Sequence, residues 1–293
     1  MACFTTCYND LMSNKCAYCG TESKLTVEHI IPSFLYDLSK VRRIGYNPKA
    51  KKVVESELRI KDICTTCNND KLSILDTYCK NFYSQNKVHL FHDSNKRLLV
   101  IYNYELLTRF LLKMSYNYSR LLGKRFEVFN DLKSYILDGS EGKPISQIRI
   151  YLEIISRVKI TTGTKKFLAD KIKNSIYSGT EVGDYLEHDP HRVGEVGPIG
   201  FKTDLTIRFI TIHSYYFHIL IFPSYANDDE IKSDIHTFEK LSKRAERLIP
   251  DKKSITVKVS KRNTLDVWSE HHLKQYQQYD DYYKDKNKGI STK

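Results

Sequence analysis

The segments CAYCGTESKLTVEHIIP (residues 16–32) and CTTCNNDK (residues 64–71) decide how the first part of this 293-residue chain folds. Each contains one Cys-x-x-Cys pair, and the pairs are Cys16/Cys19 and Cys64/Cys67. Such a pair places two thiolates on one tight turn, and two such turns supply the four sulfurs of a tetrahedral zinc. We therefore expect these four cysteines to hold one zinc ion.

The expected zinc is structural, because four sulfur ligands leave no open position for water. The chain has seven cysteines, and an odd number clustered at one end argues against a disulfide scaffold. The alternatives are a redox Cys-x-x-Cys or four buried thiols, but a redox pair does not need a second copy. A segment this small has too little core to fold alone, so the metal should hold it together.

The string Glu28-His29-Ile30-Ile31-Pro32 lies between the two pairs, and Asn68 directly follows Cys67. Side chains of Glu28 and His29 point to opposite faces of a regular strand but diverge less at a strand end or bulge. Asn68 should project back toward this string, because one zinc ties both turns. Neutral imidazole can activate water, and carboxylate and amide oxygens suit Mg²⁺ or Mn²⁺. The alternatives are a structural histidine and an asparagine that caps a helix.

Taken together, these residues resemble the HNH endonuclease family, whose core is a ββα-metal or treble-clef fold. The resemblance covers about residues 16–76 and implies a role for each matched position. Cys16, Cys19, Cys64 and Cys67 hold structural zinc, and His29 is the general base. Glu28 and Asn68 bind the catalytic Mg²⁺ or Mn²⁺, with Asn69 as the alternative to Asn68, and Lys71 contacts phosphate.

The formal charge of +12 and the pI of about 9.2 favour a polyanionic partner, and nucleic acid is the default. The alternative is a lysine-rich solvated surface. A basic stretch lies between the two cysteine pairs, and its glycine and proline indicate a loop or short hairpin. The candidate nucleic-acid-binding residues in it are Lys40, Arg42, Arg43, Lys49, Lys51 and Lys52. We expect double-stranded DNA as the substrate.

The fold class expected is α+β, with a small zinc-stapled ββα-metal domain followed by a larger mixed α+β domain. The expected divisions are a nuclease domain at 1–92, a second domain at 98–270 and a disordered tail at 271–293. Hydrophobic periodicity predicts helices at 70–83, 104–122, 126–137 and 228–248. It predicts strands at 146–159, 204–213, 215–222 and 254–259, and a loop at 180–200.

Two further groups of residues have two interpretations each. His188, Asp189, His191 and Glu195 are either a second metal site or, as we favour, a polar loop around Pro190. The helix at 104–122 interleaves tyrosines with basic residues, which suits base stacking. Its strong apolar stripe favours the alternative, a helix face packed on the C-terminal domain.

The function expected is hydrolysis of DNA phosphodiester bonds, in antiviral defence or restriction. The first alternative is a catalytically silent zinc module that binds nucleic acid. The second is a nuclease subunit that needs a partner protein or a nucleotide signal, and a homo-oligomer is a further expectation. No run of 18 uncharged apolar residues exists, so no membrane span is expected. The first residues lack the pattern of a secretory signal, so a cytoplasmic location is expected.

Overall fold

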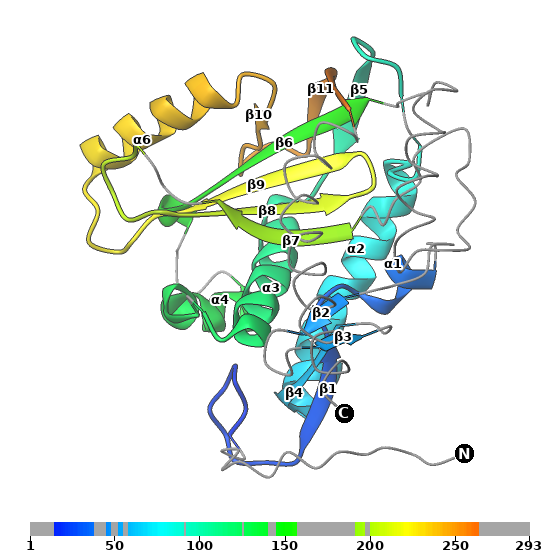
Figure 1. Cartoon of the computed structure of the whole chain (residues 1–293), viewed down its shortest axis with the longest axis vertical. Helices are drawn as coiled ribbons and strands as arrows, with labels where there is room; N and C mark the ends of the chain where they lie inside the picture. The colour runs from blue at the N-terminus through cyan, green and yellow to red at the C-terminus, as the bar shows by residue number, and fades with distance from the viewer. Residues whose placement is uncertain are drawn as a thin grey trace, which may run out of the picture.

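The computed structural model describes residues 15–37, 45–47, 52–54, 58–90, 92–124, 126–139, 145–156, 191–196 and 200–263 (Figure 1). These residues form both helices and strands, which confirms the mixed α+β class. No helix in these ranges combines the length and apolar character needed to cross a bilayer. The predicted tail at 271–293 and the basic residues Lys40, Arg42, Arg43, Lys49 and Lys51 lie outside them.

The N-terminal segment contains a two-stranded antiparallel sheet made by β1 (Leu25–His29) and β4 (Arg59–Cys64). A π-helical turn, η1 (Thr66–Leu72), follows β4 and continues into α2 (Ser73–Gln85), so the helix predicted at 70–83 is confirmed. The short helix α1 (Ser33–Asp37) follows β1. The strands β2 (Gly45–Asn47) and β3 (Lys52–Val54) pair antiparallel, which confirms the hairpin alternative for the basic stretch.

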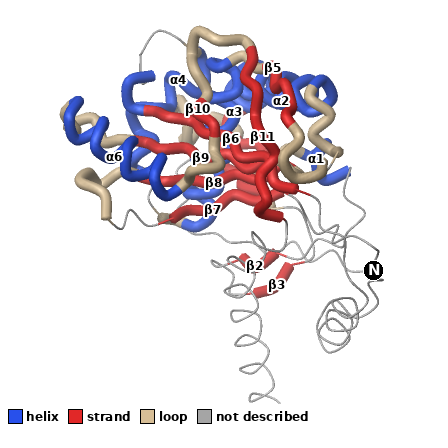
Figure 2. Tube along the Cα trace, turned by 90° about the horizontal axis from the view of Figure 1, so that it is seen from above, coloured by secondary structure: helices blue, strands red, loops and turns tan. Residues whose placement is uncertain are grey.

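A seven-stranded mixed sheet forms the larger part of the molecule, in the order β5-β11-β6-β9-β8-β7 with β10 also paired to β6 (Figure 2). Its strands are β5 (Arg97–Ile101), β6 (Ile148–Ser156), β7 (His191–Val196), β8 (Thr206–Ile212), β9 (Tyr215–Ile221), β10 (Glu246–Arg247) and β11 (Ser254–Asn263). All neighbours are antiparallel except β6 and β11. The four predicted strands are confirmed as β6, β8, β9 and β11.

Two sequence predictions in this region are wrong in part. Residues 180–200 were expected to be a loop, but His191–Val196 forms the edge strand β7, paired residue by residue with β8. The segment HRVGEV lacks the alternation of a half-buried strand, so its conformation depends on that partner. The helix expected to reach 248 ends at Leu241 as α6 (Asp228–Leu241), because Glu246 and Arg247 pair with β6.

Helix α3 (Tyr104–Leu122) has the predicted bounds, and its two ends are encoded locally. The side chain of Asn103 accepts a hydrogen bond of 3.0 Å from the main-chain N–H of Leu106, which caps the first turn. Gly123 ends the helix with a φ of 65°, a left-handed conformation that glycine adopts without strain. The predicted shorter helix is a 3₁₀ turn, η2 (Glu127–Leu132), followed by α4 (Lys133–Asp138). A second 3₁₀ turn, η4 (Ile145–Gln147), leads into β6.

Helices α2 and α3 lie on one face of the large sheet, and α6 lies on the other (Figure 1). One hydrophobic core extends from Cys16 and Leu35, through Phe82 and Phe110, to Ile150 in the sheet. A separate cluster lies under α6, where the rings of Tyr151 and Phe238 are 4.8 Å apart. The division at residues 92–98 stays a prediction, and the main core runs across it.

Candidate metal centre

The first Cys-x-x-Cys pair lies on a tight turn held by main-chain hydrogen bonds. Gly20 donates a bond of 2.8 Å to the carbonyl of Cys16, and Cys16 donates one of 2.9 Å to Thr21. Gly20 has a φ of 74°, which a residue with a side chain rarely adopts. This geometry turns the chain back directly after Cys19, so that both thiols face the second pair.

The second pair lies where β4 passes into the helical turn η1. Cys64 is the last residue of β4, and the main-chain N–H of Cys67 donates to the Cys64 sulfur at 3.4 Å. Ala17, between the cysteines of the first pair, donates a main-chain bond of 2.8 Å to Asp62 on β4. Backbone contacts therefore hold the two pairs against each other.

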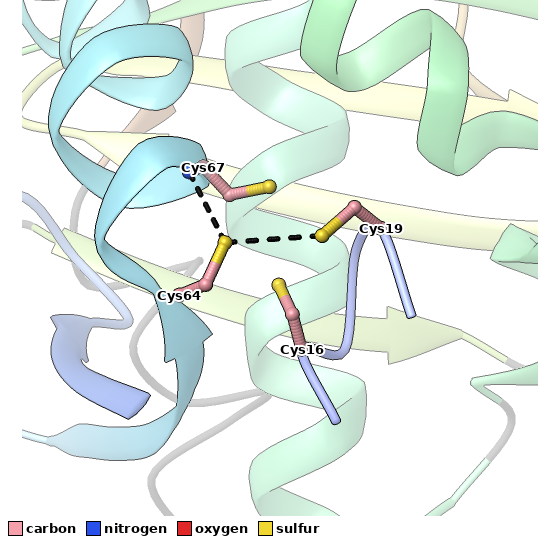
Figure 3. A group of neighbouring side chains, drawn as sticks. All are labelled: Cys16, Cys19, Cys64 and Cys67. Carbon is pink, nitrogen blue, oxygen red and sulfur yellow. Dashed lines mark hydrogen bonds between the residues drawn. The ribbon is translucent and has the colours of Figure 1, made fainter. Parts of the chain in front are cut away.

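The four sulfurs form one cluster, with all ligand atoms within 4.8 Å of one another (Figure 3). The sulfurs of Cys19 and Cys64 are 3.8 Å apart. Four sulfurs on a tetrahedron at about 2.3 Å from zinc would be about 3.8 Å apart, so the spacing fits that ion. The described cysteines form no disulfide. Within the described ranges, no other group of three or more histidine, cysteine or acidic side chains has this arrangement.

The thiols in the cluster influence one another strongly. Burial, followed by hydrogen bonds with Cys64 and Cys19, raises the pKa of Cys67. Burial also raises the pKa of Cys64. Burial opposes ionisation of Cys19 too, but hydrogen bonds with Thr21, Cys16 and Cys67 lower the pKa of Cys19 to about 6. A divalent cation would stabilise all four cysteines as thiolates, because a metal binds the deprotonated sulfur.

The strand β1 presents the predicted catalytic residues beside this cluster. The β1–β4 register shifts between Thr26 and Val27, so a bulge precedes Glu28 and His29. Glu28 is buried, with 6% of its surface exposed, whereas Val27 is exposed. His29 is half-buried, and its Nε2 atom is inaccessible to solvent.

Asn68 contacts β1 at the two residues directly before Glu28. Its amide nitrogen donates to the hydroxyl of Thr26 at 3.0 Å and to the carbonyl of Val27 at 3.1 Å. Both donor hydrogens of the amide are thereby used, so only its oxygen could serve as a metal ligand. Asn69 instead accepts a hydrogen bond at its main-chain carbonyl from Ser73, one turn later in the helix.

Lys71 pairs with an acidic side chain from a different element. Its ammonium lies 2.6 Å and 2.8 Å from the two carboxylate oxygens of Asp138, at the end of α4. The hydrogen bond to Asp138 raises the pKa of Lys71. A phosphate at this position would compete with that carboxylate. The remaining predicted basic residue, Lys52, lies in β3.

Glu28 has a buried cation as its partner. The ammonium of Lys113, from α3, lies 2.7 Å from Oε1 of Glu28 and 2.7 Å from Oδ1 of Asp76 on α2. Burial lowers the pKa of Lys113, but the Asp76 and Glu28 carboxylates outweigh it and raise that pKa. Lys113 is therefore charged, and three elements meet at its ammonium.

Polar residues on one stripe of α3 contact the cysteine and histidine segment. Tyr116 donates to the carbonyl of Ala17 at 2.9 Å, Asn117 donates to the carbonyl of His29 at 3.3 Å, and Arg120 forms an ion pair with Asp62. These side chains are buried, so the packing interpretation of the interleaved tyrosines and basic residues is confirmed. The hydrogen-bond and ion-pair partners of these three side chains lie in the segment that carries the cysteines and His29.

Sequence reasoning did not assign a role at the site to Lys113, Asn117 or Asp62. The available signal was polar spacing within an apolar helix: Lys113, Tyr116, Asn117 and Arg120 recur at intervals of three and four residues. Such a stripe predicts one polar helix face, but it does not identify the segment that the face contacts.

Of the four residues considered as a second metal site, the structure describes two, and both belong to β7. Glu195 on β7 forms an ion pair of 2.6 Å with the buried Arg208 on β8, and His191 begins the same strand. His188 and Asp189 lie outside the described residues. The favoured loop interpretation is wrong for 191–196, and the pairing of Glu195 with Arg208 gives its carboxylate a structural partner.

An open cleft of about 510 Å³ lies at the other end of α2, away from the cysteines. Its lining residues are Tyr78, Asn81, Phe82, Gln85, Ile101, Tyr102, Asn103, Tyr104, Glu105, Pro250, Asp251, Lys252 and Lys253. None of the residues expected to bind metal or carry out catalysis contributes to it.

Comparison of the chain with protein-family models, with curated proteins and with solved structures gave no match. Inference about its function therefore rests on the geometry of the site.

Proposed function

We propose that the chain is an HNH-type endonuclease that hydrolyses DNA phosphodiester bonds with a divalent cation. The observation that carries the proposal is the contact of Asn68 with β1, beside Glu28 and His29. The element order β1, β4 and α2 around four clustered cysteines supports a ββα-metal core. Zinc on those cysteines would fix the distance between the strand and the start of the helix.

In this proposal His29 accepts the proton of the attacking water at its imidazole ring. The bond from Asn117 to the His29 carbonyl, and the pairing of His29 with Arg59 on β4, fix the main chain at that position. Glu28 and the Asn68 amide oxygen are hard ligands that would hold Mg²⁺ or Mn²⁺. That ion would offset negative charge on the phosphate and the leaving oxygen.

The net charge of +12 supports a nucleic-acid substrate, because the phosphate backbone attracts basic proteins without regard to sequence. Double-stranded DNA is the substrate proposed, and restriction or antiviral defence is the proposed context. Infection of cells that express the parent or the His29→Ala chain would test this context by plaque counts.

A second function is favoured by two specific features. Glu28 is already neutralised by Lys113, and Nε2 of His29 is inaccessible to solvent. Both suit a catalytically silent zinc module that binds nucleic acid, or a nuclease that becomes active only with a partner. The enzyme proposal requires Glu28 to release the Lys113 ammonium and bind the divalent cation instead. A catalytically silent module does not require this exchange.

The test is cleavage of supercoiled plasmid by the purified full chain with Mg²⁺ or Mn²⁺, with and without EDTA. We expect EDTA-sensitive cleavage by the parent and a loss of about 100-fold or more in His29→Ala. His236→Ala is the matched control, because His236 is an exposed histidine on α6 and should retain full activity. Zinc content and thermal midpoint are measured on each sample. A folded His29→Ala chain that cuts DNA as fast as the parent would refute the proposed endonuclease mechanism.

A further inference from the structure

Two carboxylates share the buried ammonium of Lys113. The side chain of Lys113 is 2% exposed and that of Glu28 is 8% exposed, whereas that of Asp76 is 36% exposed. Lys113 donates to both carboxylate oxygens of Asp76, at 2.7 Å and 2.8 Å. It also lies 2.7 Å from Oε1 of Glu28.

The two carboxylates differ in what each would lose without Lys113. Glu28 is buried, and a buried carboxylate without a cation is strongly destabilising. Asp76 is partly exposed, so water can solvate its charge. Lys113 therefore stabilises Glu28 more than it stabilises Asp76.

A divalent cation on Glu28 would change this balance. It would neutralise the Glu28 carboxylate and repel the nearby ammonium. Lys113 has a second partner within reach, because Asp76 already accepts both hydrogen bonds. A lysine suits such an exchange, since its ammonium is a compact charge on a flexible stem.

We propose that Lys113 is a positioning residue that holds Glu28 in the metal-free protein, competes with the divalent cation, and is retained by Asp76 when that cation binds. This inference rests on the proposed function, because it takes Glu28 as a ligand of the catalytic cation. Lys113 sets the affinity of the site for metal and keeps Glu28 aligned before metal arrives.

The competition predicts opposite effects for two substitutions. Lys113→Met keeps a buried side chain of similar length and removes the competing charge, so Mn²⁺ affinity rises. Asp76→Asn removes the charge that retains Lys113, so the ammonium stays on Glu28 and Mn²⁺ affinity falls. We expect a change of about tenfold in each direction, a common size for coupling between two sites.

The experiment titrates Mn²⁺ into the zinc-loaded full chain and measures free Mn²⁺ by electron paramagnetic resonance, without DNA. Asp76→Glu should restore the parental affinity, and Glu105→Gln is the matched control. Glu105 pairs with Arg109 on the same helix, away from Glu28. Zinc content and thermal midpoint are measured on each sample, and Asp76→Asn still decides the matter if Lys113→Met does not fold.

The possible outcomes separate this inference from the function on which it rests. A parent chain that binds no Mn²⁺ would contradict both. Mn²⁺ binding that is lost in Glu28→Gln but unchanged in Asp76→Asn would refute the competition alone, leaving the proposed metal site intact. A fall in affinity in both Lys113→Met and Asp76→Asn would show a purely structural role for Lys113 and also refute the competition.

Discussion

The hydroxyl of Tyr18, inside the first Cys-x-x-Cys turn, donates a hydrogen bond of 2.8 Å to the side-chain oxygen of Asn117 on α3. The two residues are 99 positions apart in the chain. Asn117 also donates to the His29 carbonyl and accepts a hydrogen bond from Arg120. One buried amide therefore links the first cysteine turn, the histidine strand and the long helix.

Removing this amide should destabilise the N-terminal segment as a unit. We expect Asn117→Ala to lower the free energy of unfolding by about 2–4 kcal/mol, because buried groups on Tyr18, His29 and Arg120 lose a partner. Urea unfolding followed by circular dichroism measures the change. Lys124→Ala, at an exposed site just after α3, is the control and should stay within about 0.5 kcal/mol of the parent. An equally small effect for Asn117→Ala would contradict the proposed link.

The cysteine cluster should bind one zinc ion per chain. Cys67→Ser should lower zinc content and thermal midpoint together, because the metal holds together a segment with little core of its own. Zinc is measured by plasma mass spectrometry on protein of known concentration. Cys79→Ala is the control, since Cys79 is buried in α2 outside the cluster and should leave zinc content unchanged. A Cys67→Ser chain that retains full zinc would show that the cluster is not the binding site.

The contact between Gly194 on β7 and Phe209 on β8 should be intolerant of a larger residue. The two residues are directly paired, and a methyl group at 194 would overlap the ring of Phe209. We expect Gly194→Ala to destabilise the fold by about 1–3 kcal/mol, a usual size for overpacking.

Phe209→Leu should reduce that penalty, because it removes the ring that the methyl group meets. A double-mutant cycle in urea measures the coupling, and additive effects of the two substitutions would argue against this pairing of β7 with β8.

Acid should destabilise the fold partly through His218. Burial, and then the charge of Arg262, lower the pKa of His218 to about 3, so the folded chain keeps this ring neutral. The unfolded chain binds a proton near pH 6.5, so between about pH 6.5 and 3 the unfolded state holds the extra proton. Stability therefore falls as the pH falls, by up to about 1.4 kcal/mol per pH unit from this group.

His218→Phe should reduce that slope, because the ring packs beside Tyr216 and Phe238 and the substitution keeps its shape. Free energies of unfolding between pH 7 and 5 give the comparison. An identical slope in the two proteins would count against a neutral buried histidine.

Features that depend on near neighbours were predictable from the sequence. The ends of α3 follow from Asn103 and Gly123, and the strand pair β8–β9 follows from its run of β-branched and aromatic residues. The two Cys-x-x-Cys pairs predicted one four-sulfur cluster, because each pair forms its own turn. Asn68 could be placed near β1 because it adjoins a cysteine of that cluster.

The tertiary structure alone decided which distant residues share a buried charge. Nothing local to Glu28 specifies Lys113 as its partner, since the two lie on β1 and α3 and meet beside Asp76 of α2. Strand β7 likewise takes its conformation from pairing with β8. The sequence by itself determined the local elements and the two Cys-x-x-Cys turns, because these depend on spacing along the chain. Packing determined the cation beside Glu28, because burial leaves an ionised carboxylate stable only where some segment supplies an opposite charge.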